Sequence, residues 1–240
     1  MHVIEYPNDR ASRYLYRAGA GTALLFLIYL AATILIFALV KGGFPETATD
    51  CFAMFRENRF IAFLRLDIVS VVVLPFYYLL FFSIYQAIKL KNELFARIAF
   101  FCTLAGMTIF ICGINTASIV TLSDTYNAAT SPEHRERLLA ACEALLAANM
   151  WENTGAIMSG ILTETGAIIF SALMLRTKVF NRATGWLGVV THCFDFSSNL
   201  LGVFSPFFKE MFTMVAGPLY ILWFIMIGIG LLQLGKDMDP

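Results

Sequence analysis

Three ionisable side chains lie inside long apolar stretches, and they are the residues whose types and spacing could do chemistry. His192 and Asp195, with Asn199, stand at positions i, i+3 and i+7, which places them on one face of a helix. Glu164 lies at the centre of another apolar stretch. An ionisable group within a membrane span costs about 2.5–3.5 kcal/mol on insertion scales, so each one requires an explanation. An imidazole close to a carboxylate can hold or pass a proton, which is the functional hypothesis for these groups.

The same residues could instead hold helices together or bind a metal ion. Polar side chains in membrane helices often form hydrogen bonds between helices, and for Glu164, His192 and Asp195 this role and a functional one both stay open. Their nitrogen and oxygen atoms would suit zinc or iron, but the chain has no HExxH or paired ExxH pattern. No nucleophile elbow, phosphate-binding loop or dinucleotide fingerprint occurs either. We therefore expect no metal, no cofactor and no nucleophilic catalytic residue.

Other polar residues near these stretches would extend the candidate site towards the outer surface. Glu152 is predicted at the outer mouth of the segment that holds Glu164, and Asn115 lies nearer the outer side of its own segment. Asp67 follows Arg65 near the outer boundary, where an ion pair between the two is the simplest interpretation. With Asn199, these residues could line a polar cavity that opens outward and ends at about mid-membrane. For Asn115 and Asn199, hydrogen bonding between helices is the favoured interpretation.

The composition shows what kind of protein must position these residues. Of 240 residues, 59% are hydrophobic and 14% charged, against about 45–50% and about 25% in soluble domains. The mean hydropathy is +0.72, and 17 basic residues balance 17 acidic ones. Zero net charge excludes a basic nucleic-acid-binding protein, and the apolar content indicates an integral membrane protein.

Apolar runs predict an all-α membrane domain that occupies the whole chain, 1–240, with six transmembrane helices. A span needs about 20 mostly apolar residues. Pro75 and Pro218 each remove a backbone donor, so we expect kinks there. The six predicted spans are 18–40, 66–88, 98–122, 154–175, 183–204 and 211–234.

The distribution of basic residues predicts the orientation of these spans. Ten of the 17 Lys and Arg residues lie in the N-terminal arm, in the loops 89–97 and 176–182, and at Lys236. Short loops rich in Lys and Arg stay in the cytoplasm, so both termini are expected on the cytoplasmic side of the inner membrane.

The two long external loops are predicted to contain short interfacial helices. Residues 50–65 begin with Asp50 as a helix cap and mix Phe with charged residues. Residues 131–150 begin with Ser131 and Pro132, a favourable N-cap and first helical residue. The second helix would lie on the outer ends of the bundle, with docking of a partner as the alternative. Its apolar face would be formed by Leu138, Leu139, Cys142, Leu145 and Leu146.

Cys51 and Cys142 both fall in these external loops. A disulfide is chemically permitted on that side of the membrane. Nothing in the sequence sets the distance between the two residues, so two free thiols are the preferred interpretation.

The stretch 164–190 resembles a family of six-span bacterial and archaeal membrane proteins, domain of unknown function 4386. Phe180-Asn181-Arg182 occupies the place of that family's Phe/Leu-Pro-Arg turn, with Asn181 where proline is usual, and Leu187-Gly188 matches its Leu-Gly pair. The start of the second span, around Arg65 and Asp67, is also similar, with altered spacing. The resemblance implies a six-span architecture and no particular chemistry.

The sequence therefore predicts a membrane protein whose role is not enzymatic. It would bind or translocate a small or lipidic ligand through the polar cavity, or serve as a subunit of a membrane assembly. The alternative is a membrane enzyme that acts on a lipid or isoprenoid with Glu164, Asp195 and His192. Membrane lipids are the expected partners, with another membrane protein or a second copy as alternatives and no nucleic acid.

Overall fold

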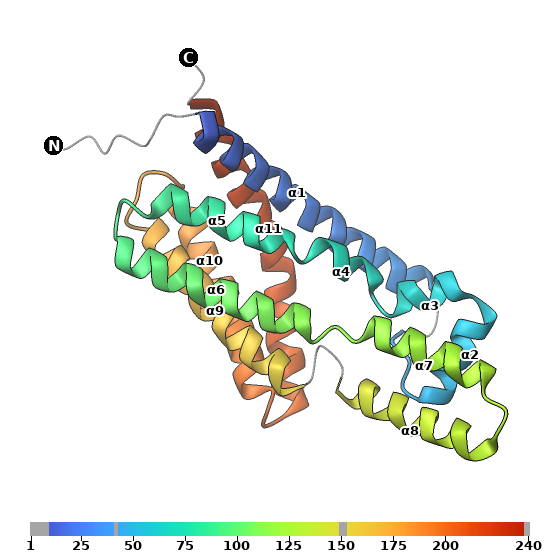
Figure 1. Ribbon diagram of the computed structural model, residues 1–240. Helices are drawn as coiled ribbons and strands as arrows, with labels where there is room; N and C mark the ends of the chain where they lie inside the picture. Colours follow the sequence, from blue (N-terminus) through green and yellow to red (C-terminus); the bar gives the residue numbers. More distant parts are fainter. Residues whose placement is uncertain (1–9, 41–42, 149–152, 238–240) are drawn as a thin grey trace.

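The computed structural model describes residues 10–40, 43–148 and 153–237 (Figure 1). These residues form helices joined by short connections, and no strand occurs among them. The predicted all-α class is therefore confirmed. The helices are α1 (Arg10–Leu39), α2 (Ala48–Glu57), α3 (Arg59–Arg65), α4 (Ile68–Val73), α5 (Phe76–Ile88), α6 (Glu93–Cys112), α7 (Thr116–Ala128), α8 (Pro132–Ala147), α9 (Thr154–Met174), α10 (Arg182–Leu201) and α11 (Pro206–Asp237).

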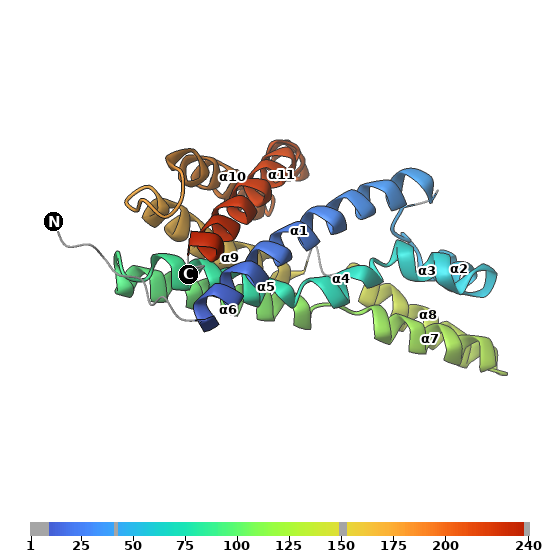
Figure 2. The same cartoon turned by 90° about the horizontal axis from the view of Figure 1, so that it is seen from above.

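Six apolar helices pack around one core. Helix contacts run from α1 to α5, α6, α9, α10 and α11 in turn, and α11 packs back onto α1, so the six form a closed ring. Figures 1 and 2 show α6 beside α9 and α1 beside α11. The shared core holds Phe26 of α1, Phe81 of α5, Phe170 of α9 and Trp223 of α11, all at most 3% exposed. Burial of these large apolar side chains holds the ring together.

Within the described residues, four segments are long and apolar enough to cross a membrane. They are Arg10–Ile36, Glu93–Ala128, Thr154–Met174 and Pro206–Lys236, and they indicate a multi-pass membrane protein. The other two predicted spans, 66–88 and 183–204, are not among these four segments. Residues 66–88 are divided between α4 and the short apolar helix Phe76–Ile88, and α10 is a continuous helix that carries the polar residues discussed below.

Two of the predicted spans contain backbone interruptions. At Pro75, where a kink is expected, the regular helix is interrupted: α4 ends at Val73 and α5 begins at Phe76, while Leu74 and Pro75 between them keep helical dihedral angles. The predicted span 98–122 is also interrupted, since α6 ends at Cys112 and a new helix starts at Thr116. By contrast, α11 continues through Pro218 as a single helix.

Helices α2, α3, α7 and α8 form a separate four-helix layer at one end of the molecule (Figures 1 and 2). The layer has its own small core, which includes Phe52, Phe55, Ile119 and Leu146. The loop helices predicted from 50–65 and 131–150 correspond to α2 with α3 and to α8, whose residues Leu138, Cys142 and Leu146 are buried.

The N-cap predicted for α8 is confirmed, whereas the N-cap predicted for α2 is wrong. Ser131 caps α8 and accepts a hydrogen bond from the His134 amide, as predicted. Asp50 is not the cap of α2: the helix begins after Thr47, whose side chain accepts from the Asp50 amide at 3.1 Å and donates to the Asp50 carboxylate at 2.8 Å. The Thr47 hydroxyl thus caps a backbone amide of the first turn and is itself held by the Asp50 carboxylate, which explains the earlier start.

Close approach of α6 to α9 depends on glycine. A Cβ atom on Gly106 would lie 2.7 Å from the Ser159 carbonyl oxygen and 2.8 Å from the Thr163 amide nitrogen. A Cβ on Gly166 would lie 2.5 Å from the Ala99 carbonyl oxygen. Because these neighbours are backbone atoms, they cannot rotate away as a flexible side chain could.

We expect Gly106→Ala to destabilise the protein by about 1–3 kcal/mol, the usual cost of overpacking. The measurement is the thermal midpoint of the detergent-solubilised protein. Gly21→Ala in α1 is the matched control, since a Cβ there meets no atom within 4 Å. Equal midpoints for the two variants would contradict the close packing of α6 on α9.

Candidate functional site

The predicted ionisable residues meet in one hydrogen-bonded group between α9, α10 and α11. His192 Nδ1 lies 2.7 Å from Glu164 Oε2. The hydroxyl of Tyr220 lies 3.0 Å from the same carboxylate oxygen and 2.8 Å from Asp195 Oδ2. Tyr220 therefore joins the two carboxyl groups, and we call these four residues the polar group.

The Tyr220 hydroxyl contacts two carboxyl groups but carries too few hydrogens to donate to both. A phenol carries a single hydrogen, so the Tyr220 hydroxyl can donate to only one carboxyl group at a time. Both hydrogen bonds form together only if the other carboxyl, from Glu164 or Asp195, is protonated and donates to the phenol oxygen. One proton shared among these groups would thus satisfy both contacts of the Tyr220 hydroxyl at once.

Burial makes these hydrogen bonds costly to break. His192 is 2% exposed and Glu164 is 5% exposed, so little solvent reaches either side chain. A buried polar group that loses its partner costs about 1–3 kcal/mol, and more when it is charged. The hydrogen bonds thus hold α9, α10 and α11 in a defined rotation about their axes.

The polar group forms one wall of a cavity of about 350 Å³. All six helices of the ring contribute to its lining, together with Leu74 just before α5. Much of the remaining lining is apolar or aromatic and includes Leu30, Tyr77, Phe81 and Phe110. Cavities of about 300–1,000 Å³ with mostly apolar walls and a few polar groups are typical of small-molecule sites.

A second set of polar residues lines the cavity near the ends of α10 and α11 joined by the connection 202–205. Ser198 lies 2.7 Å from the Thr213 hydroxyl and donates to the Lys209 carbonyl oxygen at 3.1 Å. Asn199 lies against Gly160 of α9, and its side-chain amide donates to the Asp195 carbonyl oxygen at 2.9 Å. The cavity is therefore polar both at the polar group and beside this connection.

The structure brings together four of the seven residues predicted for the site. Glu164, His192, Asp195 and Asn199 all line the cavity, whereas Asp67 and Asn115 do not, and Glu152 lies outside the described residues.

The two predicted residues that lie elsewhere have structural partners. Asp67 accepts a hydrogen bond at 2.7 Å from the hydroxyl of Tyr29. Since Tyr29 lines the cavity, Asp67 helps to position a side chain of the cavity wall. Asn115 donates to the Ala148 carbonyl oxygen at 3.2 Å, which joins the start of α7 to the end of α8. This contact agrees with the predicted role of Asn115 in hydrogen bonding between helices.

Aromatic residues of the site were missed from the sequence. Tyr220 and Trp223 are not among the residues predicted for the site, yet both line the cavity. The signal that could have found them is helical spacing: Thr213, Tyr220 and Trp223 stand at i, i+7 and i+10, on one face of α11.

Further buried polar atoms lie near His192, in addition to the Glu164 carboxylate. Trp223 packs edge-on to the His192 ring, with ring centroids 4.6 Å apart at 87°. Within the described residues, His192 Nε2, Trp223 Nε1 and Ser171 Oγ are buried and have no hydrogen-bond partner. Gly188 leaves the space between two of them, since a Cβ there would lie 2.3 Å from Ser171 Oγ and 2.6 Å from Trp223 Nε1.

The described residues offer no group of three or more His, Cys, Asp or Glu side chains arranged to hold a metal ion. The His192 nitrogen that faces Glu164 is already engaged in a hydrogen bond.

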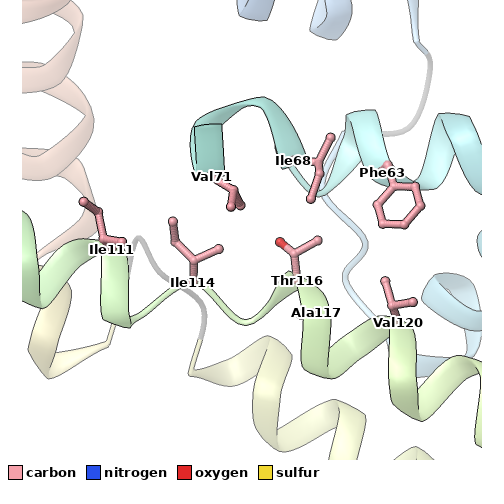
Figure 3. A pocket seen from close by; sticks show the side chains of 8 residues that line it. All are labelled: Phe63, Ile68, Val71, Ile111, Ile114, Thr116, Ala117 and Val120. Carbon is pink, nitrogen blue, oxygen red and sulfur yellow. The ribbon is translucent and has the colours of Figure 1, made fainter. Parts of the chain in front are cut away.

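Another pocket, of about 380 Å³, lies between α3 and α4 on one side and the α6–α7 break on the other. Figure 3 shows Val71 and Ile68 facing Ile114 and Thr116 across it. Its lining is apolar except for Thr116, whose hydroxyl donates to the Leu66 carbonyl oxygen at 3.3 Å. This pocket offers no group for acid–base chemistry, so the cavity at Glu164 remains the candidate site.

We expect Tyr220→Phe to lower the thermal midpoint, because it removes the hydroxyl shared by two buried carboxyl groups. The cost should be about 1–3 kcal/mol, the penalty for leaving a buried polar group unsatisfied. Tyr78→Phe is the matched control, since the Tyr78 hydroxyl bonds only to Thr108 at an exposed position among its described contacts. A Tyr220→Phe variant as stable as the control would show that the polar group does not hold the three helices.

Comparison with known proteins identifies the family of the chain and supplies no activity. No curated protein matches the sequence, and no solved structure matches it. A family model matches residues 20–235, which include every residue that lines the cavity and most of the described chain. This match confirms the resemblance seen in the stretch 164–190, and the chain belongs to the family described as domain of unknown function DUF4386.

Proposed function

We propose that this protein spans the membrane six times and binds a small amphiphilic ligand in the cavity at Glu164. One observation carries the proposal: Glu164, His192, Asp195 and Tyr220 converge on one wall of a cavity whose other walls are largely apolar. A purely structural cluster of hydrogen bonds has no need of an adjoining space of about 350 Å³.

The packing supports the six-span arrangement. The segment Ile68–Ile88, taken through the break at Pro75, is 21 residues long and at about 1.5 Å per residue reaches about 30 Å, the thickness of the hydrocarbon core. Helix α10 contributes the sixth span, with its polar face turned to the cavity rather than to lipid.

The ends of the ring support an even number of spans. Gly235, near the end of α11, lies against Arg13 and Arg17 at the start of α1, so the two ends of the ring lie on the same side. Phe180, in the basic loop before α10, packs near Gly230 on the same side. Basic residues from both termini and this loop thus gather at one end, which favours placing that end in the cytoplasm.

Fusion reporters test this topology. A fluorescent protein fused after residue 240 should fold and fluoresce, because it would stay in the cytoplasm. Alkaline phosphatase inserted between Ala129 and Thr130, in the connection between α7 and α8, should be active because that enzyme needs an oxidising compartment. An inactive phosphatase there, with an active one at the C-terminus, would invert the proposed orientation.

The lining predicts the chemistry of the ligand. Two carboxyl groups and a phenol favour a ligand head that donates hydrogen bonds, such as an amine or a polyol. The aromatic and aliphatic walls favour an apolar body, which together with the head describes a lipid-like amphiphile. Because the polar group can hold a proton, release of the ligand can be coupled to protonation of a carboxyl group, and this coupling would serve translocation.

The test of ligand binding is mass spectrometry of organic extracts from the protein purified out of its native membrane. We expect an amphiphile to co-purify with the unmodified chain and to fall about tenfold or more with Glu164→Gln or Asp195→Asn, since hydrogen bonds to charged groups contribute about 1.5–3 kcal/mol. Asn115→Ala, outside the cavity, is the control and should retain the ligand. Equal extracts from all variants would overturn the proposal, and a stoichiometric second protein chain would favour an assembly subunit.

A membrane enzyme that acts on a lipid or isoprenoid is the second candidate. The 2.7 Å contact between His192 and Glu164 favours it, because a histidine oriented by a carboxylate can act as a general acid or base. The purified protein would then convert a component of the membrane lipid extract, and His192→Gln would abolish the conversion. An unchanged lipid profile after long incubation excludes this candidate.

A further inference from the structure

The four-helix layer brings together two cysteines that are far apart in the sequence. Cys51 of α2 and Cys142 of α8 both lie in the core of the layer with no exposed surface. Among the described residues, the remaining cysteines lie on α6 and α10, away from this layer.

A hydrogen bond fixes α2 against α8 at the level of these cysteines. The Ala48 amide donates to Glu143 Oε1 at 2.7 Å. Ala48 lies one helical turn before Cys51, and Glu143 directly follows Cys142. The two helices therefore approach each other where the thiols lie.

The two thiols contact each other and differ in acidity. The hydrogen bond from Cys51 lowers the pKa of Cys142, whereas the same contact and burial raise the pKa of Cys51. A thiolate is the form that attacks a disulfide, and a thiol held against a second thiol is placed to complete the exchange.

We propose that Cys51 and Cys142 form a disulfide that ties α2 to α8. The oxidant is the disulfide of a thiol–disulfide oxidoreductase on the side of the membrane that the layer faces. Before the core of the layer closes around the two cysteines, the thiolate of one of them attacks that disulfide and forms a mixed disulfide, which releases one thiolate of the oxidoreductase. When α2 packs on α8, the other thiol loses its proton and attacks the sulfur of the first cysteine, which releases the second thiolate; two thiols are oxidised and one disulfide is reduced.

The position of the two cysteines explains what such a bond would stabilise. The layer has a small core of its own, and α2–α3 and α7–α8 are connected in sequence only through α4 to α6. A disulfide that closes so long a loop restricts the unfolded chain more than a short one does. It would also secure the contact between Thr116 and Leu66, next to Asp67, which holds the cavity residue Tyr29.

Peptide mapping of the unreduced protein tests the proposal directly. Membranes from expressing cells are quenched with N-ethylmaleimide in denaturant, and the purified full-length chain is digested and analysed by mass spectrometry. We expect a cross-linked peptide pair that contains Cys51 and Cys142, and maleimide on Cys112 and Cys193. Maleimide on both Cys51 and Cys142 in most molecules would overturn the proposal, whether or not the cavity binds a ligand.

A stability measurement provides a second test that does not depend on one variant folding. Reduction with a phosphine should lower the thermal midpoint of the wild-type chain by several degrees, the range expected for loss of a disulfide that closes a long loop. The double variant Cys51→Ser/Cys142→Ser should show no response to the phosphine. Cys112→Ser/Cys193→Ser is the matched control and should respond as the wild type does. An equal thermal midpoint of the wild-type chain with and without the phosphine would contradict the proposal.

Discussion

The arrangement of this molecule depends on the requirement that polar groups inside an apolar bundle satisfy one another. Glu164, His192 and Asp195 come from two antiparallel helices, and Tyr220 of a third helix supplies the hydroxyl that joins the carboxyl groups. Because Glu164 and His192 are almost fully buried, each partner that is removed leaves a costly unsatisfied atom. The polar group and the apolar core of the ring therefore fix the rotation of α9, α10 and α11 together.

Small residues make this convergence geometrically feasible. Gly160 gives room to Asn199, Gly188 gives room to Ser171 and Trp223, and Gly106 brings α6 onto α9. Membrane helices gain little from the hydrophobic effect when they associate, so close backbone approach and interhelical hydrogen bonds supply the specificity. Glycine in this chain is thus part of the construction of the cavity, even where it does not line it.

Sequence periodicity and hydropathy predicted the helices well and their interruptions poorly. The breaks before Ile68 and after Cys112 lie in stretches whose neighbours, such as Val69 and Ile114, are fully apolar, so averaging over a window hides them. Asp67 adopts a left-handed conformation with φ of 50°, which nothing in its residue type demands. Tyr220 was missed for a related reason: in a chain with 15% aromatic residues, one tyrosine is not distinctive without a partner to bond.

The sequence by itself determined the membrane class, the all-α fold, the family and the identity of the few charges that are expensive to bury. These properties follow from composition, from apolar run length and from local motifs, which do not depend on how distant segments meet. Only the tertiary structure decided that Glu164 and His192 touch, that Asn115 serves another contact and that Cys51 reaches Cys142. Each of these depends on the rotation and register of separate helices, which are set by side-chain packing across the whole ring and have no local signature in the chain.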